Sequence, residues 1–195
     1  MIVYSIVSGG FSHKEEPLLE NVTFQLQSSS RVVLSGPSGI GKSTLLQLIF
    51  GSKTWNVGDE TRDCPVHFQP QNDLLFPWKT VRENLVFTTP PQTEIDHYLD
   101  QVGLAHAVNL CPGELSQGMK QRVTFLRTLL SRRPLLLFDE PFANLDDACT
   151  KVLSSLLIEE QNRVGFATVI VTHNNRHKEL LEAEAWAIED GGLRC

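Results

Sequence analysis

The stretch GPSGIGKST, residues 36–44, lies between two apolar runs and contains three glycines, Gly36, Gly39 and Gly41. Glycines let backbone N–H groups curl around phosphate oxygens at points where a side chain would obstruct them. The apolar run before the stretch predicts a buried strand. The run after it predicts a helix whose positive N-terminus points at the same phosphates. The spacing therefore predicts a loop that binds the phosphates of a nucleotide.

The side chains that end this stretch predict how phosphates and a metal ion are bound. Lys42 is long enough to reach the β- and γ-phosphates, and the Ser43 hydroxyl is placed to bind Mg²⁺. Thr44 completes this polar group. The predicted nucleotide-binding segment also includes Pro37, Ser38 and Ile40.

Composition and charge limit the class of protein. The chain has 195 residues, of which 41% are apolar and 21% charged, as expected for one folded core rather than a disordered chain. Its net charge of −6 argues against a nucleic-acid-binding protein, because these are usually basic. Cations do cluster between 120 and 133, where we expect the solvated face of a helix. The four cysteines form no C-x-x-C pair, which favours reduced thiols over a zinc site.

No apolar run in the sequence approaches the about 18 residues that a membrane-spanning helix needs. Residues 1–7 lack the positive start and the long apolar stretch of a secretion signal, and they predict a strand. A membrane function would therefore need another polypeptide to supply the membrane-spanning part.

Two short, almost wholly apolar runs, at 134–140 and 166–172, predict strands buried on both faces of a parallel sheet. A helix is predicted between them at 147–163, and this order indicates an α/β fold with a mostly parallel sheet. The inward residues of that helix are expected to be Val152, Leu153, Leu156 and Leu157. Elsewhere we expect two or three strands in 1–35, a helix at 42–50 ended by Gly51, connecting structure at 51–66 and a short strand at 65–71.

Residues 77–115 have a different, helical pattern. Thr80, with Glu83 three residues later, predicts a capping box at the start of one helix. Thr93 and Gly103 are the predicted cap and stop of a second helix. The apolar face of this second helix is expected to consist of Ile95, Tyr98, Leu99 and Val102. A long helix near 117–133 then leads back to the core.

The run LLLFDE, residues 135–140, ends a predicted strand with two adjacent carboxylates. In phosphate-loop enzymes an aspartate at such a strand end holds Mg²⁺, usually through water, which is the role expected of Asp139. Glu140 then points toward the γ-phosphate and is a candidate general base for an attacking water.

The segment ELSQGMKQRV, residues 114–123, predicts a second place that could receive an anion. Ser116 stands at the start of the long helix, where the positive end of the helix dipole lies, and Gly118 follows closely. One nucleotide does not need two such sites on one chain. The simplest hypothesis is that this second site serves the nucleotide of a neighbouring subunit.

Further motifs complete an order that resembles one family. The segment FQPQNDLLFPWKTVRENL (68–85) precedes the serine helix start, and NLD (144–146) and VTH (171–173) follow LLLFDE. With these motifs nearly the whole chain resembles an ATP-binding cassette (ABC) ATPase subunit. The resemblance implies a P-loop NTPase (RecA-like) core, a trimmed antiparallel β lobe and a small helical subdomain. A single domain would fill 1–195, with a core lobe at 1–76 and 116–195 and a helical insert at 77–115.

The resemblance also implies a head-to-tail pair of subunits that closes over two ATP molecules. The phosphate loop would grip ATP and Mg²⁺ from one side, and Ser116 and Gly118 of the other subunit would cap the γ-phosphate. His173 would hold the γ-phosphate and the catalytic geometry, while Asp146 would cross the interface between the two sites. Asp139 and Glu140 would keep the roles given above.

Two assignments keep alternatives open. For the glutamine that senses Mg²⁺ and nucleotide, Gln71 is preferred to Gln69, because its spacing to the following Pro-Trp pair is the family's usual one. An aromatic residue near the N-terminus would stack on adenine; Phe11 is preferred, and Tyr4 is the alternative.

The sequence departs from the family in its signature segment, which usually reads L-S-G-G-Q. Here residues 115–119 read LSQGM, so Gln117 replaces a glycine and Met119 replaces a hydrogen-bonding residue. We hypothesise that the closed pair forms more weakly or more slowly than usual. The short distance between Lys42 and Gln71 also leaves little room for the family's antiparallel strands.

The resemblance is strongest to importer ATPases, including those for sulfonates and nitrate, through LLFPWKTVRENL and DEPFANLD. The chain is then expected to drive solute transport through a separate membrane permease, at the cytoplasmic face of the membrane. The expected partners are the permease, a second ABC ATPase copy or paralogue and a solute-binding protein, but no nucleic acid. Two alternatives remain: a nucleotide-gated binding module that hydrolyses ATP poorly, and a soluble ABC ATPase without a transport role.

Overall fold

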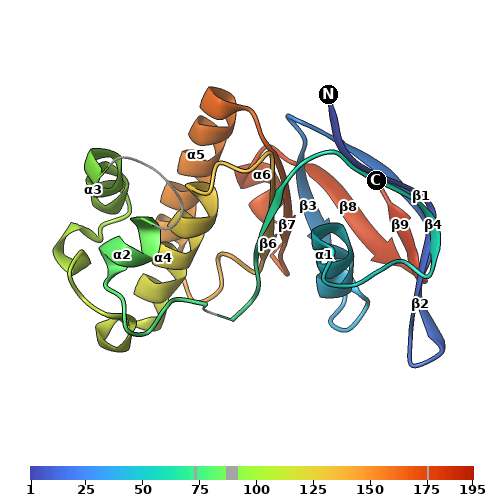
Figure 1. Cartoon of the computed structure of the whole chain (residues 1–195), viewed down its shortest axis with the longest axis horizontal. Helices are drawn as coiled ribbons and strands as arrows, with labels where there is room; N and C mark the ends of the chain where they lie inside the picture. Colours follow the sequence, from blue (N-terminus) through green and yellow to red (C-terminus); the bar gives the residue numbers. More distant parts are fainter. Residues whose placement is uncertain (73, 87–91, 175) are drawn as a thin grey trace.

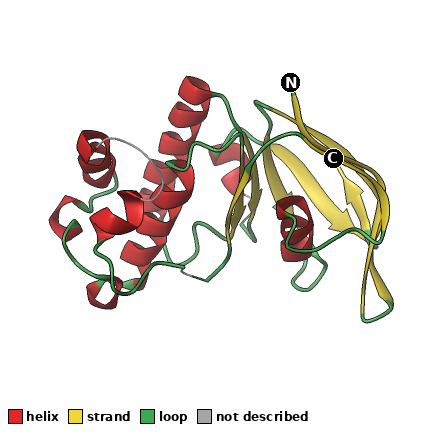
Figure 2. Cartoon of the chain, in the orientation of Figure 1, coloured by secondary structure: helices red, strands yellow, loops and turns green. Residues whose placement is uncertain are grey.

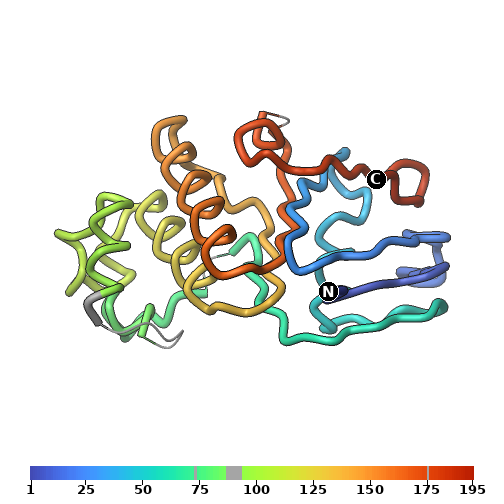
Figure 3. Tube along the Cα trace, turned by 90° about the horizontal axis from the view of Figure 1, so that it is seen from above, coloured from blue at the N-terminus to red at the C-terminus, as the bar shows by residue number. Residues whose placement is uncertain are grey.

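A computed structural model describes residues 1–72, 74–86, 92–174 and 176–195 of the chain. Within these ranges the strands form two sheets, and the helices lie mostly at one end of the molecule (Figures 1 and 2). The chain order confirms an α/β protein with strands and helices alternating through its core. Seen from above, the N-terminal strands and the last strand lie at the same end, opposite the helices (Figure 3).

The larger sheet has the strand order β5-β6-β7-β3-β8-β9. All its neighbouring strands are parallel except the last pair. This confirms the mostly parallel sheet predicted from the apolar runs. Its strands are β3 (Arg31–Ser35), β5 (Val66–Gln69), β6 (Leu135–Asp139), β7 (Ala167–Val171), β8 (Glu184–Glu189) and β9 (Gly192–Arg194).

The smaller sheet is antiparallel, with the order β2-β1-β4. Its strands are β1 (Ile2–His13), β2 (Glu16–Gln27) and β4 (Val57–Arg62). The prediction that 51–66 is only connecting structure was wrong, because β4 pairs with β1 along that segment. All six residues of β4 are exposed, and only Val57 is large and apolar. The sequence of this edge strand therefore lacks the alternation of apolar and polar residues that predicts a strand.

The larger sheet is buried on both faces, which explains its nearly continuous apolar strands. Val33, Leu136 and Ile170 face a core shared with the helices α4 (Gln117–Leu129) and α5 (Asp147–Val164). Leu34 and Leu137 face the opposite core, shared with helix α1 (Lys42–Phe50) and the antiparallel sheet. Because side chains alternate along a strand, each of these short strands supplies both cores.

Helix α1 ends, and helix α2 begins, where capping residues predict. Helix α1 (Lys42–Phe50) ends at Gly51, which is left-handed and donates its N–H to the carbonyls of Gln47 and Leu48. Helix α2 (Val81–Val86) has the predicted capping box: the Thr80 N–H donates to the Glu83 carboxylate at 2.8 Å, and the Glu83 N–H donates to the Thr80 hydroxyl. The other helices are α3 (Gln92–Gln101), α4 (Gln117–Leu129), α5 (Asp147–Val164), α6 (Arg176–Leu180) and two 3₁₀ turns, Ala105–Ala107 and Pro112–Glu114.

Helix α3 has the predicted apolar face, since Ile95, Tyr98, Leu99 and Val102 are all buried. It begins at Gln92, so Thr93 lies inside the helix and is not its cap. Sequence capping signals locate a helix end only to within one or two residues. Gly103 is left-handed just after the helix, where the predicted stop was placed.

Arginines of helix α4 bind other elements instead of forming only a solvated face. Arg122 donates to the Val102 carbonyl and Arg127 to the Leu74 carbonyl, each at 2.7 Å. Arg132, just beyond the helix, pairs with Glu94 of α3. These bonds fix α3 and the segment after β5 to α4.

Helix α5 buries Leu153, Leu156 and Leu157 as predicted, but Val152 is 42% exposed. Successive residues in a helix are separated by about 100°. Val152 therefore lies at the margin of the stripe centred on Leu153, and its inward assignment was wrong.

Leu153→Ala should lower the free energy of unfolding by about 2–5 kcal/mol, because it removes a fully buried side chain and leaves a cavity. Its neighbour gives the control: Val152→Ala should change the same free energy by about 0.5 kcal/mol or less. Chemical denaturation of both variants measures the difference. Equal losses would contradict the observed burial of α5.

Candidate active site

A cavity of about 230 Å³ lies at the ends of the parallel strands. The loop after β3, the last residue of β6, the residues after β7 and a residue after β5 all contribute to its wall. Parallel strands bring their carboxyl ends to one edge of the sheet, which is where open α/β sheets bind ligands. The lining residues are Ser38, Gly39, Gly41, Lys42, Ser43, Thr44, Gln71, Asp139, Glu140, Val171 and His173.

The loop between β3 and α1 has a conformation that only glycine adopts readily. Gly41 precedes the first residue of α1 with φ 112°. A Cβ atom there would lie 3.3 Å from Leu19 and 3.4 Å from Leu18. The helix can therefore begin directly at the cavity, with its free N–H groups and positive dipole end facing it.

Lys42 is bound within the loop that it follows. Its Nζ donates to the carbonyls of Gly36 and Pro37, both at 2.7 Å. Burial lowers the pKa of Lys42, and the carboxylates of Glu140 and Asp139 oppose that shift. The ammonium group is thus positioned at the cavity by two carbonyls and by two acidic residues across it.

Asp139 ends β6 and is buried at the cavity wall. Burial raises the pKa of its carboxyl group, while a hydrogen bond from Ser43 and the charges of Lys42 and His173 lower it. A carboxylate and a hydroxyl in contact are oxygen donors of the kind that Mg²⁺ prefers. Asp139 and Ser43 therefore fit a magnesium ion.

Glu140 and His173 meet across the cavity, with 3.2 Å between Glu140 Oε1 and His173 Nε2. Glu140 has a left-handed backbone, φ 52°, and its N–H donates to the Val171 carbonyl of β7. Such a conformation is uncommon for a residue with a side chain and is often found at functional sites. Burial raises the pKa of Glu140, whereas His173 lowers it.

Gln121 was missed in the sequence, although it supports the same acidic segment. It lies on α4, is almost fully buried, and its Nε2 donates to the carbonyls of Glu140 and Pro141 at 3.1 and 2.9 Å. In the sequence, the feature that could have indicated Gln121 was its place beside the apolar face of the predicted helix. Its partners come from a distant strand end, so the sequence could not name them.

The two glutamines considered for the loop after β5 lie in different places. Gln71 lines the cavity, whereas Gln69 ends β5 and is 2% exposed. The buried side chain of Gln69 does not reach the cavity wall.

The two aromatic candidates also differ. Tyr4 is fully buried, stacks on Phe24 and accepts a hydrogen bond from Trp55, so its ring cannot receive a base. Phe11 is half-buried, and Lys53 Nζ lies 5.2 Å from its ring centroid. Phe11 lies in β1 and pairs with Leu19 of β2, whose side chain an added Cβ at Gly41 would meet at 3.3 Å.

The signature segment does not line this cavity, and neither does Asp146. Ser116 caps α4 by accepting the Met119 N–H, and Asp146 caps α5 by accepting the Cys149 N–H at 2.7 Å. Gly118 lies against the segment before Asp146, where an added Cβ would be 3.3 Å from the Asn144 carbonyl. Gln117 is exposed, and Met119 packs against the core.

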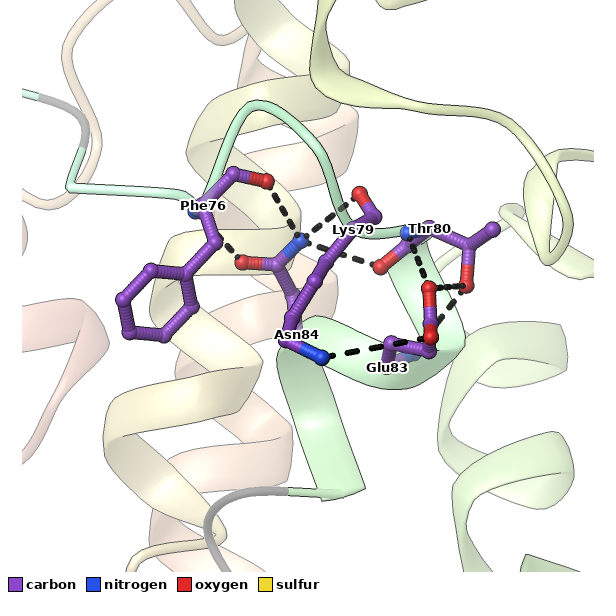
Figure 4. A network of polar contacts seen from close by, with 5 residues as sticks. All are labelled: Phe76, Lys79, Thr80, Glu83 and Asn84. Carbon is purple, nitrogen blue, oxygen red and sulfur yellow. Dashed lines mark hydrogen bonds and ion pairs between the residues drawn. The ribbon is translucent and has the colours of Figure 1, made fainter.

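Asn84 lies at the centre of a network of hydrogen bonds in the segment that follows Gln71 (Figure 4). Asn84 is fully buried. Its Oδ1 accepts the Phe76 N–H at 2.8 Å, and its Nδ2 donates to the carbonyls of Phe76, Lys79 and Thr80. These bonds fix the turn that carries Trp78, which is 74% exposed, next to partly exposed Phe76 and Leu74.

Comparison with known proteins identifies the family. The sequence model described as "ABC transporter" matches residues 19–143, more than half of the chain. The chain belongs to the ABC transporter family. As an ATP-binding subunit of this family it is an ATPase, which confirms the predicted activity and ATP as its nucleotide.

Curated relatives of this ABC subunit are import or transport ATP-binding proteins. An aliphatic sulfonates import protein of Albidiferax ferrireducens is 36% identical over 90% of this chain and 67% of its own length. A probable sulfate/thiosulfate import protein of Chlorella vulgaris is 35% identical, over 90% and 82%. A bicarbonate transport protein of Synechocystis sp. is 33% identical over 97% of this chain but only 30% of its own length.

Solved structures confirm the fold of this ABC subunit. An ATP-binding subunit of an ABC transporter superposes with a TM-score of 0.87, covering 99% of this chain and 88% of that one at 22% identity. Membership of a transporter family implies a separate membrane permease and an association with the membrane. Among the described residues, none of the helices has the length and apolar character of a membrane span.

Lys42→Ala should weaken ATP binding roughly tenfold to a hundredfold, because a hydrogen bond to a charged group is worth about 1.5–3 kcal/mol. Fluorescence titration with a labelled ATP analogue measures the dissociation constant. Lys151→Ala, an exposed lysine of α5, is the control and should bind as the wild type does. Unchanged affinity in Lys42→Ala would mean that nucleotide binds elsewhere.

Proposed function

We propose that the cavity binds the triphosphate of Mg²⁺–ATP and that the residues around it carry out hydrolysis. The loop 36–44 would donate its backbone N–H groups to the phosphates, with Lys42 as their cation. Ser43 and Asp139 would hold Mg²⁺, with Gln71 beside them on the cavity wall. The ion would neutralise charge that develops on the phosphate oxygens. Phe11 would stack on adenine.

Glu140 and His173 are proposed to act on the attacking water and the γ-phosphate. Glu140 must be ionised to accept a proton, and Lys42 and His173 favour its ionised form. His173, 3.2 Å from Glu140, would donate to the γ-phosphate and keep the two groups aligned.

The observation that supports the proposal is that the cavity and the start of α4 are separate places on the chain. The cavity has the phosphate loop and the acidic pair, while Ser116 and Gly118 lie away from it. The start of α4 could bind an anion, but a triphosphate in the cavity of the same chain would lie too far away to reach it. A second copy arranged head to tail would bring the two places together, with Asp146 at their boundary.

The surface around Trp78 is proposed to contact the permease. Exposed apolar side chains on a turn fixed by Asn84 suit a docking site for a helix of another protein. The turn follows Gln71 closely in sequence, so nucleotide binding could move it. In this proposal residues 77–115 form a helical insert, and 1–76 with 116–195 form the core lobe.

We also propose that the transporter is an importer of a small anion, working with a solute-binding protein at the cytoplasmic face of the membrane. Support comes from the relatives, which are named for sulfonates, sulfate or thiosulfate, and bicarbonate.

Glu140→Gln tests the hydrolytic proposal. The variant should retain ATP binding and lose turnover by about 10²- to 10⁴-fold, the usual contribution of a general base. Light scattering with Mg²⁺ and ATP should then show a stable dimer, because the closed pair cannot reopen by hydrolysis. Glu159→Gln, an exposed change on α5, is the control. A monomeric variant with normal turnover would refute the proposal.

The second candidate function is a binding module that hydrolyses ATP poorly. The one feature that favours it is the departure of residues 115–119 from the usual signature sequence. Gln117 is exposed at the start of α4, where a glycine would let a phosphate approach the backbone. A wild-type turnover at background level would support this module.

Gln117→Gly should raise ATP turnover by roughly fivefold, equivalent to about 1 kcal/mol, the value of one typical hydrogen bond. Gln117→Asn keeps a side-chain amide in the same place and should not raise it. The single change is preferable to one that includes Met119→Gln, because Met119 packs against the core. Phosphate release at saturating ATP measures the effect; equal rates for both variants would contradict the hypothesis.

A further inference from the structure

His177 contacts the residues on either side of His173, although no motif of the nucleotide site includes it. It belongs to the short helix α6 and is only 9% exposed. Its Nδ1 lies 2.8 Å from the Thr172 hydroxyl, and its ring meets Phe142 edge-on with 4.8 Å between centroids. A polar side chain buried in this way usually holds defined partners in place.

His177 contacts both neighbours of His173. Its side chain bonds to Thr172, and its backbone N–H donates to the Asn174 carbonyl at 3.1 Å. The Thr172 hydroxyl in turn accepts the Asn174 N–H at 3.2 Å. The ring of His177 therefore bonds to one neighbour of His173, and the His177 backbone bonds to the other.

The same ring also touches the segment that carries Glu140. Phe142 follows Glu140 by two residues, so the ring of His177 lies between the two segments whose side chains meet at 3.2 Å. Burial lowers the pKa of His177, although Asp147 on α5 opposes this. The neutral ring keeps one donor and one acceptor nitrogen, which suits a hydroxyl partner.

We propose that His177 is a positioning residue that sets His173 against Glu140 and the γ-phosphate through the Thr172 hydroxyl. This inference rests on the role proposed above for His173. The ring is not among the residues that line the nucleotide cavity. It acts by fixing the backbone of the turn.

This role predicts an effect on the chemical step and little effect on ATP binding. Lys42, which is proposed to bind the phosphates, donates to the carbonyls of Gly36 and Pro37 in its own loop, whereas His177 bonds to Thr172 and Asn174. A displacement of about 1 Å in a catalytic group can cost on the order of a hundredfold in rate. Loss of the ring should therefore lower kcat and leave the KM for ATP almost unchanged.

The test compares two matched pairs of variants. His177→Leu removes the hydrogen bond, whereas His177→Asn keeps an amide near the position of Nδ1. Thr172→Val removes the hydroxyl, and Thr172→Ser keeps it. Measurements of kcat, KM for ATP and Tm should show that His177→Leu and Thr172→Val lose at least tenfold in kcat with KM within twofold. The Asn and Ser variants should recover most of that loss.

His173→Ala separates this inference from the proposed function. If His173→Ala loses turnover and both His177→Leu and Thr172→Val keep it, the positioning role is refuted and the function stands. If His173→Ala keeps turnover, the role proposed for His173 is refuted, and the inference fails with it. A parallel fall in kcat, ATP affinity and Tm, without recovery in the Asn and Ser variants, would identify a purely structural role. If His177→Leu does not fold, the comparison of Thr172→Val with Thr172→Ser, by the same kcat and KM measurements, tests the positioning role.

Discussion

Burial of both faces of the parallel sheet is the constraint on which the site depends. Short strands such as β6 and β7 supply two cores at once, so their direction and register are fixed by packing on both sides. The polar side chains of the site can then lie only where the strands end, at the carboxyl edge of the sheet. The phosphate loop, Asp139 and His173 converge there because three adjacent strands end there.

The charged side chains at the carboxyl edge of the sheet form a cavity that suits an anion bound together with a metal ion. Burial lowers the pKa of Lys42 and raises the pKa of Asp139 and Glu140, so each charge alone is unfavourable. The opposite charges offset one another across the cavity, and carbonyls hold the lysine in place. A triphosphate with its metal ion carries both signs of charge and matches this arrangement.

Patterns among neighbouring residues predicted most helices and strands and the phosphate loop. Contacts between residues far apart in the sequence could not be predicted. The glycine spacing at 36–44, the capping box at Thr80 and the apolar strands were all visible in the sequence, because each rests on neighbouring residues. Strand β4 was not visible, since its polar residues show no periodic pattern and the residues of β1 with which they pair lie 47 to 58 positions earlier in the chain. The burial of Tyr4 likewise depends on Phe24 and Trp55, which only the folded sheets bring together.

Helix α4 connects parts of the site that the sequence presents separately. Ser116 caps its start, Gln121 in its middle bonds to the segment of Glu140, and Arg127 near its end bonds to the Leu74 carbonyl beside the Trp78 turn. A helix is stiff along its axis, so these three contacts cannot move independently. An anion bound at the start of α4 would contact the same rigid helix that is bonded to the Glu140 segment and to the segment before the exposed apolar turn. In the proposed transporter, α4 would link the nucleotide to the permease through contacts that this helix already makes.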